Sequence, residues 1–156
     1  MKKIVVVSDS HGNRAVFDKL DRIFLESDYI FHLGDYSTDG GAIAKKYPNK
    51  TFFVNGNCDG PFAVGEREII TEIEGVKILA CHGHNYSVKS GIDRLLYRCE
   101  ELKCQLALYG HTHIPQIEEY QNVTLINPGC LSRFGQNSYC YIVINNGKTV
   151  AKIVEI

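Results

Sequence analysis

The chain has 156 residues, of which 44% are hydrophobic and 22% charged, and its formal net charge is −1. This length and composition are typical of a globular protein with a buried core, so we expect residues 1–156 to form a single domain. The near-neutral charge argues against a strongly basic nucleic-acid-binding surface, and no apolar run approaches the roughly 18 residues of a membrane span.

The first half of the sequence alternates between strand patterns and helical patterns. Residues 2–8 form a β-branched run that is typical of a buried strand, and residues 13–26 repeat apolar side chains at helical spacing. Short apolar runs at 29–33 and 51–54 predict two further strands, and residues 42–47 predict a short helix between them. This βαβαβ order indicates a parallel α/β sheet.

The second half carries more antiparallel signals. Residues 68–73 and 76–80 flank a Glu-Gly turn and predict a hairpin, while residues 92–102 repeat apolar side chains at helical spacing. The Asn-Asn-Gly sequence at 145–147 predicts a second hairpin turn. The remaining strands are predicted at 106–109, 117–120, 123–126, 139–144 and 149–154.

The N-terminal sequence and the cysteines indicate the cellular compartment of the protein. The N-terminal apolar run stops after four residues, which is too short for the apolar core of a secretion signal. The six cysteines form no CxxC pair, and reduced thiols are the default in a chain that lacks an export signal. We therefore expect a cytoplasmic protein without a structural disulfide.

Five short polar clusters follow predicted strands. They are DSH at 9–11, GD at 34–35, GNCD at 56–59, HGH at 82–84 and GHTH at 110–113, and they contain five of the six histidines. Open α/β folds bind ligands at the carboxyl ends of their strands, so we expect these clusters to meet. Oxygen and imidazole donors without a thiolate cage favour a borderline divalent ion such as Mn²⁺, Fe²⁺, Ni²⁺ or Zn²⁺.

This order of motifs, closed by NPGC at 127–130, resembles that of the calcineurin-like metallophosphoesterase superfamily, in which the closing motif is NPGS. The small size and the GNCD motif are most similar to the compact bacterial and archaeal branch, the YfcE-like phosphodiesterases. The resemblance implies an α/β fold, a four-layer α/β/β/α sandwich of mixed sheets. It also implies a dinuclear-metal phosphoesterase that hydrolyses small phosphodiesters by attack of a hydroxide bridging two ions, with Mn²⁺ favoured over Ni²⁺, Fe²⁺ and Zn²⁺.

Seven positions match the metal ligands of this superfamily. One ion corresponds to Asp9, His11 and His113, the other to Asn57, His82 and His111, and the carboxylate between them to Asp35. A single Asp among these would more often be a helix cap or a turn residue, and a single His a hydrogen-bonded core residue. The assignment therefore depends on the complete set.

Further polar residues are candidates for contact with substrate, each with a plainer alternative. Asn13 is expected to contact a phosphate or to cap the helix at 13–26, and His84 to touch substrate or to make a structural hydrogen bond. Arg133 is placed to meet phosphate oxygens, although a surface ion pair is the favoured alternative. Asn57 and Cys58 complete this group.

Cys58 is the chief departure from the family pattern. Many relatives have a histidine there, placed to help protonate the leaving group, and a thiol is a poor general acid near neutral pH. The loss should fall hardest on substrates with basic alkoxide leaving groups. The alternative, favoured over a reactive thiol, is a small residue packed under the metals. Residues 59–65, with their glycines and a phenylalanine, are the candidate rim for substrate.

Other functions share parts of this pattern. A phosphomonoesterase or a nucleotide pyrophosphatase would use the same ligands, whereas the retromer subunit with this fold is a protein-binding scaffold. All seven ligands are present here, which favours catalysis. The expected partner is a small phosphoester, with no stable nucleic-acid complex and no membrane contact, and the sequence leaves a homo-oligomer open.

Overall fold

The chain folds into two five-stranded mixed sheets that face each other. The computed structural model describes all residues from Met1 to Ile156. The first sheet has the order β10-β9-β1-β2-β3, from β1 (Lys2–Val7), β2 (Tyr29–His32), β3 (Thr51–Phe53), β9 (Ser138–Asn145) and β10 (Lys148–Glu155). The second has the order β4-β5-β6-β8-β7, from β4 (Glu68–Ile73), β5 (Val76–Cys81), β6 (Leu106–Leu108), β7 (Gln116–Tyr120) and β8 (Val123–Asn127).

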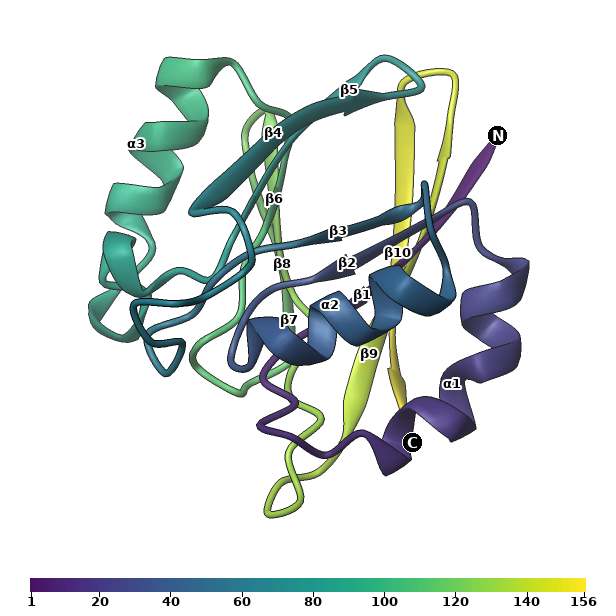
Figure 1. The fold of residues 1–156 in the computed structure, drawn as a ribbon. Helices are drawn as coiled ribbons and strands as arrows, with labels where there is room; N and C mark the ends of the chain where they lie inside the picture. The colour runs from purple at the N-terminus through teal and green to yellow at the C-terminus, as the bar shows by residue number, and fades with distance from the viewer.

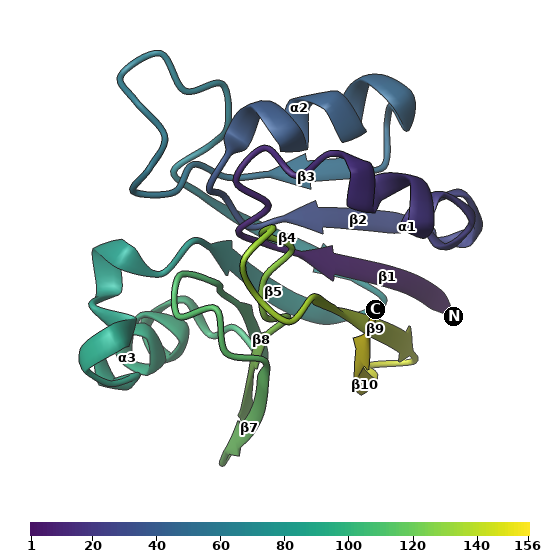
Figure 2. The ribbon, with the colours of Figure 1, turned by 90° about the horizontal axis from the view of Figure 1, so that it is seen from below.

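Helices cover the outer face of each sheet (Figure 1). The helices α1 (Ala15–Glu26) and α2 (Ser37–Lys46) lie over the first sheet, and α3 (Asp93–Leu102) lies over the second (Figure 2). Two short 3-10 helices, His84–Tyr86 and Val88–Ser90, lead from β5 toward α3. The predicted four-layer α/β/β/α sandwich is therefore confirmed.

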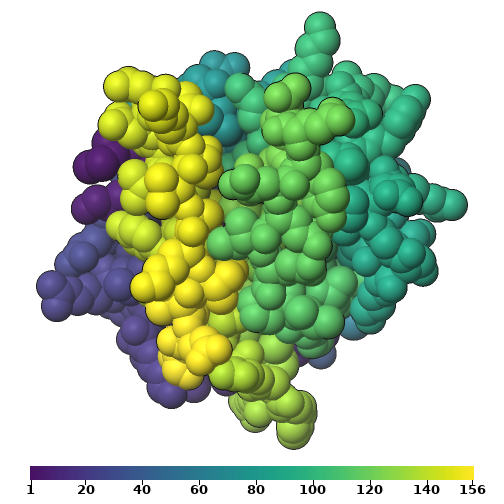
Figure 3. All heavy atoms as spheres, turned by 180° about the vertical axis from the view of Figure 1, so that it is seen from behind, coloured from purple at the N-terminus to yellow at the C-terminus, as the bar shows by residue number.

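Strand β1 explains how the layers are joined. Ile4 and Val6 pack between the two sheets, whereas Val5 and Val7 pack against α1 and α2 on the outer side. All four side chains are fully buried, which accounts for an uninterrupted apolar run in place of an alternating one. On the back of the molecule, the edge strands β10 and β7 lie side by side and close the sandwich (Figure 3).

The helix predicted at 42–47 begins earlier than its apolar pattern indicates. It starts at Ser37 and includes Gly40 and Gly41, which are poor helix formers. Gly40 is needed because a Cβ atom there would lie 2.6 Å from the Cβ of Phe53 in β3. Helix α2 lies so close to the sheet that only glycine fits at position 40, although glycine lowers the local helix propensity.

The parallel strands bring the polar clusters together. Strands β1, β2 and β3 run parallel in the first sheet, and β5, β6 and β8 run parallel in the second. Their carboxyl ends lie at one edge of the sandwich, where each of the five predicted clusters follows its strand. None of the helices is both long and apolar enough to span a bilayer.

Candidate metal centre

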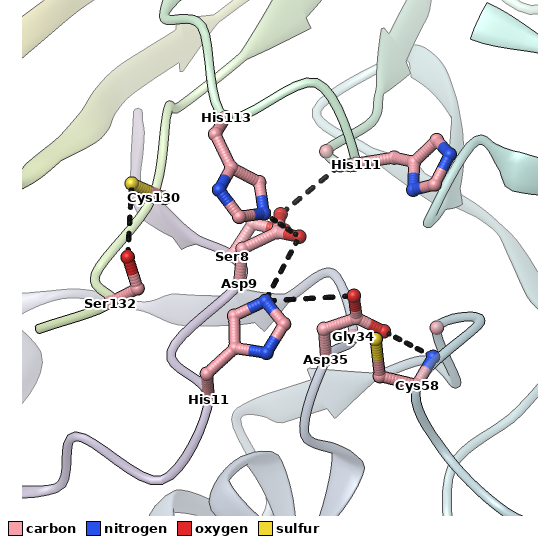
Figure 4. Close-up of polar contacts among 12 residues, drawn as sticks. Ser8, Asp9, His11, Gly34, Asp35, Cys58, His111, His113, Cys130 and Ser132 are labelled. Carbon is pink, nitrogen blue, oxygen red and sulfur yellow. Dashed lines mark hydrogen bonds and ion pairs between the residues drawn. The ribbon is translucent and has the colours of Figure 1, made fainter. Parts of the chain in front are cut away.

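The centre is built around the carboxylate of Asp9, just beyond the end of β1 (Figure 4). Its Oδ2 accepts hydrogen bonds from the Ser8 hydroxyl and from the backbone N–H of His111, 3.1 Å away. Its Oδ1 is buried and accepts no hydrogen bond, although Nε2 of His113 lies 3.0 Å away. Nε2 of His11 lies 3.9 Å from the same oxygen. This free oxygen faces the imidazoles, as a metal ligand would.

Asp35 supplies the second carboxylate, at the end of β2. Its Oδ2 lies 3.4 Å from Nε2 of His82 and 3.7 Å from Nε2 of His11, while its Oδ1 accepts a hydrogen bond of 2.9 Å from the N–H of Cys58. Burial acts to raise the pKa of Asp35, but the nearby His82 outweighs it and holds that pKa well below its ordinary value. Asp35 therefore stays ionised between the two halves of the site.

The surroundings of His82 call for a cation. Nδ1 of its ring lies 2.6 Å from the carbonyl oxygen of Leu33, which fixes a proton on Nδ1. Nε2 faces Oδ1 of Asn57 at 3.0 Å and both carboxylates at under 4 Å. A neutral ring carries one proton, which the Leu33 carbonyl holds on Nδ1. The acceptors that face Nε2 therefore need either a second proton or a metal ion. Metal-binding histidines are commonly oriented by a backbone carbonyl at their other ring nitrogen.

The pKa values follow from the same geometry. Burial disfavours the charged form of His82, but Asp35 and Asp9 outweigh it and raise its pKa. Contact with Asp9 raises the pKa of His113, whereas burial and the positive charge of His82 lower the pKa of His111 to about 4. The raised pKa values of His82 and His113 show that the carboxylates favour positive charge at these two rings.

Three groups of side chains have ligand atoms close enough to hold a metal ion. They are Asp9 with His11 and His113, Asp9 with Asp35 and His82, and His11 with Asp35 and Cys58. The first group contains the three residues predicted for one ion. The second joins both carboxylates to His82, so that Asp9 as well as Asp35 reaches into both halves of the site.

His111 and Asn57, predicted for the second ion, lie at its edge. The ring of His111 belongs to none of the three groups; it packs edge-on against His82, with ring centroids 5.0 Å apart, and is turned away from Asp9 (Figure 4). Asn57 is exposed and touches the centre through its contact with His82.

The backbone of the centre is held in an unfavourable conformation. Five of the seven predicted ligands have positive φ angles between 45° and 70°, and they are Asp9, His11, Asp35, His111 and His113. Such angles are uncommon for residues other than glycine, and they cluster at functional sites when the surroundings enforce them. Here the N–H of Asp9 donates to the carbonyl of Gly34, and the N–H of His11 donates to the carbonyl of Asp35.

Sequence reasoning missed the residues that impose this backbone. The Asp59 carboxylate accepts hydrogen bonds from the N–H groups of Gly56 (2.7 Å), Ser37 (2.7 Å) and Asp35 (3.2 Å). The Asn127 amide donates to the carbonyl of Gly110, at the start of the GHTH loop. Their positions in the motifs could have indicated this role, since Asp59 is the last residue of GNCD and Asn127 is the first residue of NPGC.

A further buried chain of hydrogen bonds was not foreseen. His32 is fully buried; its Nδ1 accepts from the N–H of Gly34, and its Nε2 contacts the Ser10 hydroxyl at 2.7 Å. Ser10 in turn donates to Asp39, which also accepts from the guanidinium of Arg14. Burial lowers the pKa of His32 to about 4, so the ring is neutral. This chain ties the loops that carry Asp9 and Asp35 to each other.

Cys58 differs from the packed residue that was favoured. Its side chain is exposed, and its thiol accepts a hydrogen bond from the Asn57 amide at 3.6 Å. Burial of part of the thiol and the neighbouring Asp35 raise its pKa, so it stays protonated in the metal-free chain. All six cysteines are unpaired in the structure.

The other substrate-proximal candidates are distributed around the centre. Asn13 does not cap α1, which begins at Ala15 without a side-chain cap; its amide donates to the Leu131 carbonyl at 2.7 Å. His84 lies beside His82, and its buried Nδ1 has no hydrogen-bond partner. Arg133 is exposed and forms no ion pair, contrary to the favoured alternative.

A cleft with a volume of about 770 Å³ opens beside His11 and His113. Residues 130–136 line much of it, while residues 59–65, expected to form the rim, line none of it. Cys130 and Ser132 lie on one side of the centre and Cys58 on the opposite side (Figure 4). The rim predicted at residues 59–65 therefore does not border this cleft, whose wall comes instead from the loop that follows β8.

Comparison with known proteins identifies similar chains. The family model described as "Calcineurin-like phosphoesterase superfamily domain" matches residues 1–147. A protein of Mycoplasma pneumoniae named "Probable metallophosphoesterase" is 30% identical, over 95% of this chain and 93% of its own length. A protein of Methanocaldococcus jannaschii named as a phosphodiesterase is also 30% identical, over 81% of this chain and 82% of its own.

Solved structures share the fold. A protein of Streptococcus pneumoniae described as a predicted phosphoesterase superposes with a TM-score of 0.84 at 26% identity, covering 99% of this chain and 89% of that one. Vps29 of Entamoeba histolytica, solved with Zn²⁺, gives a TM-score of 0.77 at 18% identity and covers 98% of both chains. At that identity the likeness to Vps29 concerns the fold alone.

Proposed function

Because this chain belongs to the calcineurin-like phosphoesterase superfamily, we propose that it is a cytoplasmic phosphodiesterase that works with two divalent transition metal ions, with Mn²⁺ the first choice. The match of the family model over residues 1–147 supports a metal-dependent phosphoesterase. Membership of the family does not specify the number of ions, the identity of the metal or the preference for diesters, and these are what we propose.

One observation carries the proposal, namely a buried oxygen of Asp9 without a hydrogen bond next to a histidine that has acceptors at both ring nitrogens. Oδ1 of Asp9 accepts no hydrogen bond, and His82 has acceptors at both ring nitrogens. Buried polar groups are almost always satisfied, so this arrangement is expected where a cation belongs. The donors are carboxylate, imidazole and amide groups, which suit Mn²⁺, Fe²⁺, Ni²⁺ or Zn²⁺.

Two ions bound here would polarise a phosphoryl group and supply hydroxide at neutral pH. The chain's own residues do the positioning. Asp9 and Asp35 lie between the imidazoles of His11 and His82, and the Leu33 carbonyl keeps Nε2 of His82 directed at them. The open cleft beside His11 and His113 leaves room for a second ester group on phosphorus, which favours a diester over a monoester.

A metal-depletion experiment tests the proposal. Protein treated with EDTA should lose hydrolysis of bis(p-nitrophenyl) phosphate, and Mn²⁺ should restore it with two ions bound per chain by elemental analysis. Full activity in metal-free protein would refute metal dependence, and restoration with one ion per chain would refute the dinuclear centre. Faster hydrolysis of p-nitrophenyl phosphate than of the diester would favour a phosphomonoesterase, and cleavage of nucleoside diphosphate esters a pyrophosphatase.

The scaffold alternative predicts a different outcome. A protein-binding homologue of Vps29 would show no metal-dependent hydrolysis of any ester. Asp9, Asp35 and His82 are buried, and their ligand atoms lie close together, an arrangement that protein binding alone leaves unexplained. Catalysis is therefore the better account of this site.

A further inference from the structure

The cleft beside the metal centre shares two residues with it. His11 and His113 both line the cleft, so a phosphoryl group seated at the carboxylates and imidazoles would direct one ester substituent into this space. The volume of about 770 Å³ is within the usual range of small-molecule sites and far exceeds the needs of a phosphate alone. The cleft therefore has room for a large substituent.

Apolar and aromatic side chains form much of its lining. Tyr36, Ile114 and Pro115 contribute from the centre's own loops, and Phe134 contributes from the loop after β8. Phe134 is 100% exposed, which is unusual for a phenylalanine because transfer of its ring out of water is favourable. An exposed aromatic ring at the mouth of a site is suited to cover a ligand.

The loop that carries Phe134 is held in place at its base. The Asn137 amide donates to the carbonyls of Ser132 and Gly135, at 2.8 and 3.2 Å. Gly135 passes so close to Cys130 that a Cβ atom there would lie 2.6 Å from its sulfur. The exposed tip of this loop, residues 133–136, projects beyond the body of the molecule (Figure 3). Phe134 is thus presented by an organised turn.

The charges of the cleft select the kind of substituent. Arg133 and Glu155 both line it, and neither is engaged in an ion pair, so one positive and one negative group balance there. Because the charges of Arg133 and Glu155 offset each other, they give a second phosphate no net attraction, and an uncharged substituent is compatible with this lining. The exposed side chain of Gln136 offers hydrogen-bonding groups within the same walls.

We propose that this cleft binds the nucleoside part of a nucleotide ester, with Phe134 stacking on the base as a specificity-determining residue. Planarity, lack of charge and edge hydrogen-bonding groups are the properties that the lining favours, and a nucleobase with its sugar has all three. The inference rests on the proposed function, because the phosphate must be held at the carboxylate and imidazole centre.

Binding of two non-hydrolysable phosphonates tests this assignment. Ethylphosphonate and the 5′-methylenephosphonate of thymidine carry the same anionic group on a P–C bond and differ in the substituent. Isothermal titration of the Mn²⁺-loaded protein should give about tenfold tighter binding of the thymidine compound, the scale of one base–aromatic stacking contact. Phe134→Ala should remove this preference and leave the Kd of ethylphosphonate unchanged.

Phe62 provides the matched control. It is 94% exposed on the opposite loop and does not line the cleft, so Phe62→Ala should leave both Kd values unchanged. Equal Kd values for the two ligands in the wild-type protein, or equal effects of Phe134→Ala on both, would overturn the proposal. So would a wild-type dimer that Phe134→Ala converts to monomer, since a second copy would then cover the ring.

The same samples separate this inference from the function itself. If the wild-type protein hydrolyses bis(p-nitrophenyl) phosphate but does not discriminate between the phosphonates, only the nucleoside assignment fails. If Mn²⁺-loaded protein hydrolyses no diester, the proposed function fails whatever the Kd values are.

Discussion

Gly56 offers a direct test of how tightly the centre is packed. A Cβ atom at this position would lie 2.0 Å from Oδ1 of Asp35 and 2.7 Å from its backbone nitrogen. Gly60, four residues along the same loop, has no atom within 4 Å of the corresponding position, and its φ angle is not in the left-handed region. Gly56→Ala and Gly60→Ala thus add the same methyl group in contrasting surroundings.

The size of the effect follows from these distances. Oδ1 of Asp35 would have to move by about 1.4 Å to reach the 3.4 Å at which ordinary contact begins, and the clash with backbone prevents a simple side-chain rotation. Overpacking of this kind costs about 1–3 kcal/mol of unfolding free energy. Displacing a catalytic group by ~1 Å can cost about 100-fold in rate.

Two measurements check this reasoning. Gly56→Ala should bind Mn²⁺ about 100-fold more weakly, hydrolyse bis(p-nitrophenyl) phosphate about 100-fold more slowly, and unfold in urea at a lower midpoint. Gly60→Ala should stay within about 0.5 kcal/mol of the wild-type stability and keep its activity. Wild-type metal affinity in Gly56→Ala, or equal losses in both variants, would refute the view that Gly56 makes room for Asp35.

Three further predictions concern the centre and its support. Asp35→Asn should reduce the bound Mn²⁺ from two ions to fewer than one per chain, whereas His113→Ala should chiefly lose one; two tightly bound ions in Asp35→Asn would contradict a carboxylate shared by both halves. Cys58→His should improve hydrolysis of cyclic nucleotides about 10²–10⁴-fold and that of an aryl diester far less, because only basic leaving groups need a proton, and equal gains would contradict this. The folded-state pKa of His32 is lowered to about 4, below the unfolded value of 6.5, so its stabilising effect is present above pH 6.5 and is lost as the pH falls toward 4. Relative to His32→Gln, the unfolding free energy of the metal-free wild type should therefore fall by about 3 kcal/mol between pH 7 and pH 4, and parallel urea-denaturation profiles would show that His32 is not buried as a neutral ring.

The sequence determined the elements whose apolar pattern is strong and local. The β-branched run of β1 and the helical spacing of Val16, Leu20 and Phe24 in α1 predicted their type because each buries the side chains that form its own pattern. The positions of the polar clusters after strands were also readable, since a parallel sheet gathers its carboxyl ends at one edge. Helix α2 was predicted too short because the reason for Gly40 lies in β3, outside the helix.

Only the tertiary structure decided how the site's side chains are held and where a substrate has space. The amide of Asn13 reaches Leu131, and the carboxylate of Asp9 reaches the backbone of His111, across separations of 118 and 102 residues. The free oxygen of Asp9 and the cleft beside Phe134 result from such contacts. A local pattern specifies which face of an element is buried, whereas the position of a hydrogen-bond partner depends on packing between elements that are distant in the chain.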